Sequence, residues 1–176
     1  MESGRILTHQ EIAFLFDDAN AVINELVAKD LVICDENNNL SGAYPFTMEQ
    51  RPHKVTINGF TVHAMCALDA LAVSPMFDLP TDIESQCDIS KMPIHIIQHG
   101  KVLHNTDDLH DVYFAINWNA ASAVSCCADS LCSEMIFIKG HSLAEQWLEV
   151  DNCNRELFTL TDAIDFAAAF FAPLLP

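Results

Sequence analysis

Basic residues are scarce in this chain of 176 residues, where eight lysines and arginines stand against 25 aspartates and glutamates. The formal net charge is therefore −17 at pH 7. A surface of this sign repels the phosphate backbone of nucleic acids and the anionic headgroups of membrane lipids. We accordingly expect neither nucleic acid nor a membrane surface as a partner.

The chain also lacks segments typical of secretion or membrane insertion. Its N-terminal stretch, MESGRILTHQEI, has no basic region followed by an apolar one, as a secretory signal would. The most apolar stretch, FAAAFFAPLLP, contains Pro173 and is too short to span a bilayer. These features predict a soluble cytoplasmic protein with reduced cysteines. The odd number of cysteines, seven, also argues against a disulfide framework.

Common motifs for phosphate, cofactor and hydrolase chemistry are missing as well. The sequence has no G-x-x-x-x-G-K-[ST] loop, no G-x-G-x-x-G, no G-x-S-x-G and no H-E-x-x-H. Hydrophobic residues nevertheless make up 51% of the chain, which is enough for the core of one domain with or without a small appendage. Candidate chemistry must therefore be sought among the cysteines and their neighbours.

Residues 1–45 have the pattern of a small winged helix. THQEIAFLF opens with Thr8 and Glu11 at capping-box spacing, and DDANAVINELVAKDL carries an apolar helical stripe. LVICDENNNLSGAYPF predicts a β-hairpin around an asparagine-rich turn. The only basic residues before position 44 are Arg5 and Lys29, too few for a DNA recognition helix. We therefore expect a structural or substrate-covering role for this segment.

Residues 46–176 change to a β-rich pattern. HKVTINGFTVH predicts a hairpin that turns at Asn58 and Gly59, and further strands are predicted for MPIHIIQHGKVL, DVYFAINW and EMIFIKG. Two helices are predicted for SLAEQWLEV and TLTDAIDFAAAFF. The expected fold is α+β: a winged-helix-like segment followed by a mixed or antiparallel sheet with packed helices.

The stretch AMCALDAL places Cys66 and Asp69 three residues apart in an apolar, helix-prone run. Residues at i and i+3 share a helix face, so the thiol and the carboxyl should meet. A cysteine in such surroundings usually behaves as a small buried hydrophobe. A buried carboxyl, however, is costly unless it is paired or protonated, and an acid of this kind beside a thiol marks a candidate functional site.

A second concentration of thiols, formed by Cys126, Cys127 and Cys132, lies in SCCADSLCSEMIF. Structural zinc sites usually combine C-x2-4-C pairs that are well separated along the chain, and this spacing does not match. His95 and His99 show no shared ligand geometry with these thiols. Two or three thiolates with a nearby acid suit a soft, thiophilic metal such as mercury.

These residues resemble one known family, the alkylmercury (organomercurial) lyases. The resemblance runs from about residue 8 to the end. It rests on GAYPFT, the hairpin before CALDAL, the CALDAL motif itself, SQC, and a C-x4-F element shortly before a helical tryptophan. Met65 and Ser133 depart from the family pattern, and the N-terminal segment is shorter.

The resemblance implies that Cys66 and Cys132 are catalytic cysteines and that Asp69 is the catalytic acid, with all three contacting the mercury of substrate and product. It implies that Cys87 is structural. The implied reaction is protonolysis, in which R–Hg⁺ and a proton give R–H and Hg²⁺ without a bound cofactor. The partners implied are an organomercurial small molecule, cellular thiols that remove Hg²⁺ and, by family analogy, a mercuric ion reductase.

The resemblance assigns no role to the other four cysteines. Cys126 and Cys127 have no counterpart in the family pattern, and they are either packed or solvent-facing thiols, or metal ligands that pass mercury outward. Cys34 and Cys153 are expected to be packing residues.

Two other functions stay open at this point. A protein that binds mercury or another thiophilic metal or organometal without turnover would use the same thiols, although binding alone gains little from Asp69. A metal-responsive transcription factor would fit the winged-helix pattern but is opposed by the charge.

Overall fold

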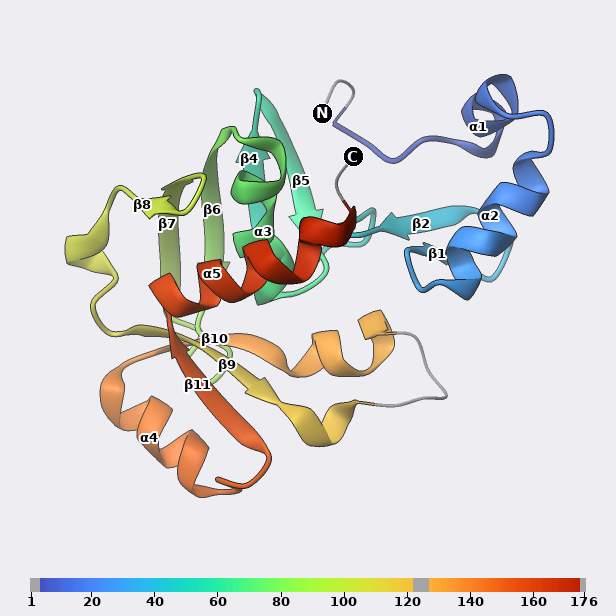
Figure 1. Ribbon diagram of the computed structural model, residues 1–176. Helices are drawn as coiled ribbons and strands as arrows, with labels where there is room; N and C mark the ends of the chain where they lie inside the picture. Colours follow the sequence, from blue (N-terminus) through green and yellow to red (C-terminus); the bar gives the residue numbers. More distant parts are fainter. Residues whose placement is uncertain (1–3, 122–126, 175–176) are drawn as a thin grey trace.

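Two antiparallel sheets organise the chain in the computed structural model, which describes residues 4–121 and 127–174 (Figure 1). The eight-stranded sheet has the order β1-β2-β3-β5-β4-β6-β7-β8. Its strands are β1 (Val32–Cys34), β2 (Leu40–Ala43), β3 (Phe46–Thr47), β4 (Lys54–Ile57), β5 (Phe60–Ala64), β6 (Pro80–Gln86), β7 (Pro93–His99) and β8 (Val102–Leu103). The three-stranded sheet, β10-β9-β11, consists of β9 (Val112–Asn117), β10 (Met135–Lys139) and β11 (Arg155–Thr159).

Five α-helices accompany these sheets in the described part of the chain. They are α1 (His9–Leu15), α2 (Ala19–Ala28), α3 (Ala67–Phe77), α4 (His141–Glu149) and α5 (Leu160–Phe171). Short 3₁₀ turns connect other elements: η1 (Thr106–Asp108), η2 (Trp118–Ala120), η3 (Cys127–Asp129), η4 (Leu131–Glu134) and η5 (Ala172–Leu174). The predicted α+β class is confirmed. None of the described helices combines the length and the apolar character needed to cross a bilayer.

The N-terminal helices and hairpin form as predicted. The Thr8 hydroxyl accepts the N–H of Glu11 at 3.3 Å, and the Glu11 carboxylate accepts the N–H of Thr8 at 2.8 Å, which completes a capping box. A small apolar cluster around Ile12 and Ile23 holds α1 and α2 together. The wing strand β2 pairs with β3, so the hairpin continues directly into the large sheet. The division of the chain at residue 45 stays a prediction.

The hairpin before CALDAL also forms as predicted. Asn58 and Gly59 both have positive φ, 51° and 79°, which is the backbone conformation that a two-residue type I′ turn requires. The turn joins β4 to β5, with Ile57 opposite Phe60. This hairpin leads the chain to Cys66, which lies two residues after the end of β5.

Helix α3 is the centre of the core. Apart from Asp69 and Ser74 its buried residues are apolar, and all residues from Ala67 to Ser74 are buried, as expected for a helix enclosed by other elements. It packs against β4 to β7 of the large sheet, against β10 of the small sheet and against α5. Helix α3 therefore connects the two sheets, and its first residues lie where they meet.

Besides the two-residue β3, two strands of the structure, β6 and β11, were not predicted from the sequence. Strand β6 contains a single aliphatic residue apart from its proline, Ile83, and its buried positions alternate with acidic ones. Strand β11 is short and only half-buried, and it pairs with β9 immediately before α5 begins. Both strands depend on partners elsewhere in the chain rather than on a strong pattern of their own.

Candidate active site

Cys66 and Asp69 meet at the beginning of α3. Cys66 is the N-cap residue, with an extended backbone, and Asp69 is the third residue of the helix. The Cys66 thiol donates to Asp69 Oδ2 at 2.7 Å, and Cys66 Sγ accepts the Asp69 N–H at 3.4 Å. The predicted juxtaposition is therefore present, but it arises from helix capping rather than from two residues within one helix face.

Cys132 comes to the same place from a distant part of the sequence. It lies in η4, three residues before β10 begins, and its Sγ is 3.9 Å from Asp69 Oδ2 across a sequence separation of 63 residues. The candidate ligand atoms of Cys66, Asp69 and Cys132 all lie within 4.8 Å of one another. These side chains are 2%, 2% and 5% exposed. Two thiols and a carboxyl thus share one small, buried site.

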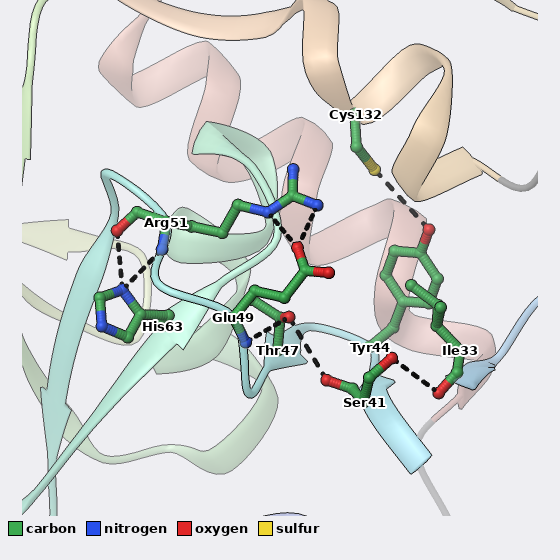
Figure 2. Close-up of polar contacts among 8 residues, drawn as sticks. All are labelled: Ile33, Ser41, Tyr44, Thr47, Glu49, Arg51, His63 and Cys132. Carbon is green, nitrogen blue, oxygen red and sulfur yellow. Dashed lines mark hydrogen bonds and ion pairs between the residues drawn. The ribbon is translucent and has the colours of Figure 1, made fainter. Parts of the chain in front are cut away.

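Two further side chains border the site that were not identified from the sequence. Met135 Sδ lies 3.7 Å from Cys66 Sγ. The Tyr44 hydroxyl lies 3.7 Å from Cys132 Sγ, and Figure 2 shows the phenol reaching toward that thiol from the segment between β2 and β3. The only sequence signal for Tyr44 is its place in GAYPFT, and Met135 has none beyond its position near Cys132.

Of the two unexplained thiols, Cys127 lies beside the site and Cys126 falls outside the described residues. Cys127 Sγ is 3.5 Å from Cys132 Sγ. The backbone N–H of Cys127 donates to Asp30 Oδ2 at 2.8 Å, so the turn after α2 fixes the position of this residue.

The remaining cysteines lie elsewhere. Cys87 is fully buried and its Sγ accepts the N–H of Ser90 at 3.3 Å, which is compatible with the structural role expected for it. Cys34 packs against the N-terminal apolar cluster, as predicted. The prediction for Cys153 was wrong, because this residue is exposed in the turn between α4 and β11 rather than packed.

Burial controls the protonation of the site. It raises the pKa of the Asp69 carboxyl to about 7, even though the bonds from Cys66 favour the carboxylate. Burial likewise raises the pKa of the Cys66 thiol to about 11. The contact with Cys127 favours the Cys132 thiolate, but Cys66, burial and Asp69 outweigh it and raise the pKa of Cys132. Burial therefore disfavours the charged forms of these groups, and a bound cation is needed to stabilise thiolates here.

The raised pKa of Asp69 predicts a pH-dependent cost in stability. Between the ordinary pKa of 3.8 and the folded value of about 7, the folded protein keeps a proton that the unfolded chain has lost. Stability contributed by this group is thus fully present below pH 4 and falls as the pH rises toward 7. We expect Asp69→Asn to raise the free energy of unfolding at pH 8 by about 1–3 kcal/mol.

Urea denaturation of both proteins at pH 4 and pH 8 measures this effect. The two proteins should differ much less at pH 4, because the Asp69 carboxyl is protonated in the folded chain and the unfolded chain still holds part of its proton at a pH close to its ordinary pKa of 3.8. Asp107→Asn, at an exposed position, is the matched control and should show no such gain. An Asp69→Asn protein that is less stable than wild type at pH 8 would contradict the assignment of a buried, destabilised carboxylate.

A cavity of about 490 Å³ lies next to this site. Its walls come from the N-terminal segment, β2, β3, β5 and the end of α3, and they are mostly apolar. Cys66, Asp69 and Cys132 do not line it, but Tyr44 does. Tyr44 therefore borders both the cavity and the buried thiols.

Comparison with known proteins identifies the family. Residues 46–172 match the family model for alkylmercury lyase. Alkylmercury lyases from Bacillus cereus and Clostridium butyricum are each 28% identical to this chain over 115 residues, which make up 65% of this chain and 51% of the relative. The chain thus spans about half the length of the curated relatives it matches.

A solved structure shares the fold. The crystal structure of the mercury-bound form of MerB2 matches with a TM-score of 0.77 at 18% sequence identity, over 95% of this chain and 82% of that one. The family match covers well over half of the chain, including both halves of the site at the start of α3 and in η4. On these findings, the chain belongs to the alkylmercury lyase family.

Proposed function

We propose that this protein cleaves the carbon–mercury bond of organomercurial compounds by protonolysis, giving a hydrocarbon and Hg(II) held by the thiolates of Cys66 and Cys132. The observation that carries the proposal is the placement of two thiols and a protonatable carboxyl within 4.8 Å of one another in a buried site. Thiolates are the ligands that soft metals prefer. The carboxyl supplies what a simple binding site does not need, namely a proton source beside the metal.

The geometry supports a definite order of proton movements. A pKa of about 7 leaves part of the Asp69 carboxyl ionised at neutral pH. When R–Hg⁺ binds the sulfur of Cys66 in this form of the site, the thiol proton passes to Asp69 Oδ2, which already accepts the thiol hydrogen bond at 2.7 Å. Cys132 then adds as the second thiolate and releases its proton. Asp69 delivers its proton to the carbon as the carbon–mercury bond breaks. The products are R–H, Hg(II) on two thiolates and one proton, so atoms and charge balance, and Asp69 returns to its starting state.

The N-terminal segment has a role in this proposal as well. We propose that residues 1–45 form a winged-helix-like cover for a catalytic domain over residues 46–176. Tyr44 from this segment reaches Cys132, and Asp30 holds the backbone of Cys127. These contacts support a covering role, because they connect the segment to two cysteines at the site rather than to an outward-facing surface. We also propose that the protein acts in the cytoplasm, where its thiols stay reduced, and that Hg(II) leaves to cellular thiols or a mercuric ion reductase.

Product analysis tests the proposed function. Fully reduced protein is incubated with phenylmercury or methylmercury in the presence of a small thiol, and benzene or methane is measured in the headspace. We expect a hydrocarbon yield that rises with time well beyond one equivalent per protein. Stoichiometric mercury binding with no hydrocarbon would show instead a soft-metal binding protein without turnover.

A further inference from the structure

Cys127 is a thiol that the proposed cleavage does not use. Cys132 contacts both Cys127, at 3.5 Å between the sulfurs, and Asp69, whose Oδ2 holds the Cys66 thiol. Solvent exposure increases from Cys66 and Cys132, which are buried, to Cys127, which is only partly buried. The three sulfurs thus form a path from the buried start of α3 toward solvent.

The position of Cys127 is fixed by the chain around it. Its N–H donates to Asp30 Oδ2 at 2.8 Å, across a sequence separation of 97 residues. The Tyr44 hydroxyl lies on the neighbouring thiol of Cys132. The N-terminal segment, which is distant in the sequence, therefore holds Cys127 in place next to Cys132, one of the two candidate catalytic cysteines.

We propose that Cys127 takes over Hg(II) from Cys66 after cleavage, so that the metal passes from the Cys66–Cys132 pair to a Cys132–Cys127 pair and from there to external thiols. This inference rests on the proposed function. The exchange forms a bond between mercury and Cys127 Sγ and breaks the bond to Cys66 Sγ, while the proton of Cys127 passes to Cys66. No electrons are transferred.

The exchange solves a problem that the buried site creates. Mercury held by two thiolates dissociates poorly as a free ion, because soft thiolates bind it strongly. A third thiol in contact with one of the two ligands lets the metal move in steps without being released. Two-coordinate mercury holds its sulfurs farther apart than 3.5 Å, so the pair must open, which the partly exposed side of Cys127 permits. Each transfer restores the Cys66 thiol beside Asp69 for the next substrate.

Mercuric chloride alone tests the proposed second position without any cleavage. All variants carry Cys126→Ser, so that the adjacent thiol cannot substitute. In the Cys66→Ser background, Cys132 and Cys127 should still hold one Hg(II) against competition by glutathione. Adding Cys127→Ser should weaken this affinity by a factor on the order of 10², since the chelating partner is lost. Adding Cys153→Ser instead, at an exposed thiol outside the site, should not. Equal affinity with and without Cys127 overturns the proposal.

Turnover provides the second readout. With phenylmercury and little external thiol, the Cys127→Ser protein should release a burst of about one equivalent of benzene and then continue about tenfold more slowly than its parent. Excess thiol should restore the rate, because it replaces the missing acceptor. An unchanged steady-state rate at low thiol overturns the relay. If the parent protein produces no benzene at all, the proposed function fails, and the mercuric chloride titration still decides whether Cys127 binds the metal.

Discussion

Replacing Cys66 with serine is expected to reduce hydrocarbon release from phenylmercury by a factor on the order of 10³ or more, the scale on which removal of an essential nucleophile acts. A hydroxyl has neither the softness nor the acidity of a thiol, so it cannot bind mercury as a thiolate does. The thiol is also the group that donates to Asp69 Oδ2 at 2.7 Å. Cys66→Ser therefore removes the first mercury ligand and the thiol that supplies a proton to the Asp69 carboxylate.

The fold gives this experiment a clear interpretation. Cys66 is the N-cap of α3, and serine is one of the preferred N-cap residues, so the substitution should keep the helix and the core. Cys132→Ser should cause a loss of similar size, because it removes the second thiolate. Cys153→Ser is the matched control at an exposed cysteine and should retain activity. Benzene measured by gas chromatography reports the rate. Wild-type activity in Cys66→Ser would contradict the proposed lyase function of this site.

Features set by neighbouring residues could be predicted from the sequence. The capping box of Thr8 and Glu11 and the turn at Asn58 and Gly59 each depend on a few adjacent residues and on well-known backbone preferences. The contact of Cys66 with Asp69 is equally local, and its i,i+3 spacing predicted it even though the cysteine caps the helix instead of lying within it. Short-range chemistry is sufficient in all of these places.

The rest of the site depends on contacts between distant segments. No pattern near Tyr44 or Asp30 indicates that Tyr44 contacts the thiol of Cys132 or that Asp30 accepts the backbone N–H of Cys127. The placement of Cys132 with Asp69 was predicted from the resemblance to a family, because no local pattern around Cys132 indicates it. Strand β6 was missed for the same reason, because its polar sequence forms a strand only between β4 and β7. Tertiary contacts overrule weak local preference at such positions.

The burial of the site affects both the stability of the fold and the ability of Asp69 to transfer a proton. Burial disfavours the carboxylate and both thiolates. At neutral pH only the Asp69 carboxyl lowers the stability of the folded chain, because the thiols are protonated in the folded and the unfolded chain alike. A cationic organomercurial reverses this balance, because it stabilises the thiolates that water can no longer solvate. The same burial keeps Asp69 able to hold a proton near pH 7. A solvent-exposed aspartate would be ionised there and could not serve as an acid.

Asp69→Asn should separate mercury binding from bond cleavage. The amide has nearly the shape of the carboxyl and can still accept the Cys66 thiol hydrogen bond, so both sulfurs should stay in place. It cannot take up a proton from Cys66 and deliver it to carbon. We therefore expect single-turnover cleavage to slow by a factor on the order of 10² or more, the scale of a positioned general acid. Affinity for Hg(II) should change little, since both thiolates remain.

The direction of the stability change distinguishes a chemical role for Asp69 from a structural one. If the carboxyl only held the start of α3, Asp69→Asn would lose stability, mercury binding and cleavage together. If the carboxyl is retained for proton transfer in spite of its burial, the variant should be more stable than wild type at pH 8 and yet slower. Rapid-quench measurement of benzene, competition for Hg(II) and urea denaturation on the same preparation test this directly. A protein that is both destabilised and unable to bind mercury would make Asp69 a structural group, whereas a more stable protein that binds mercury without cleaving phenylmercury is the expected result.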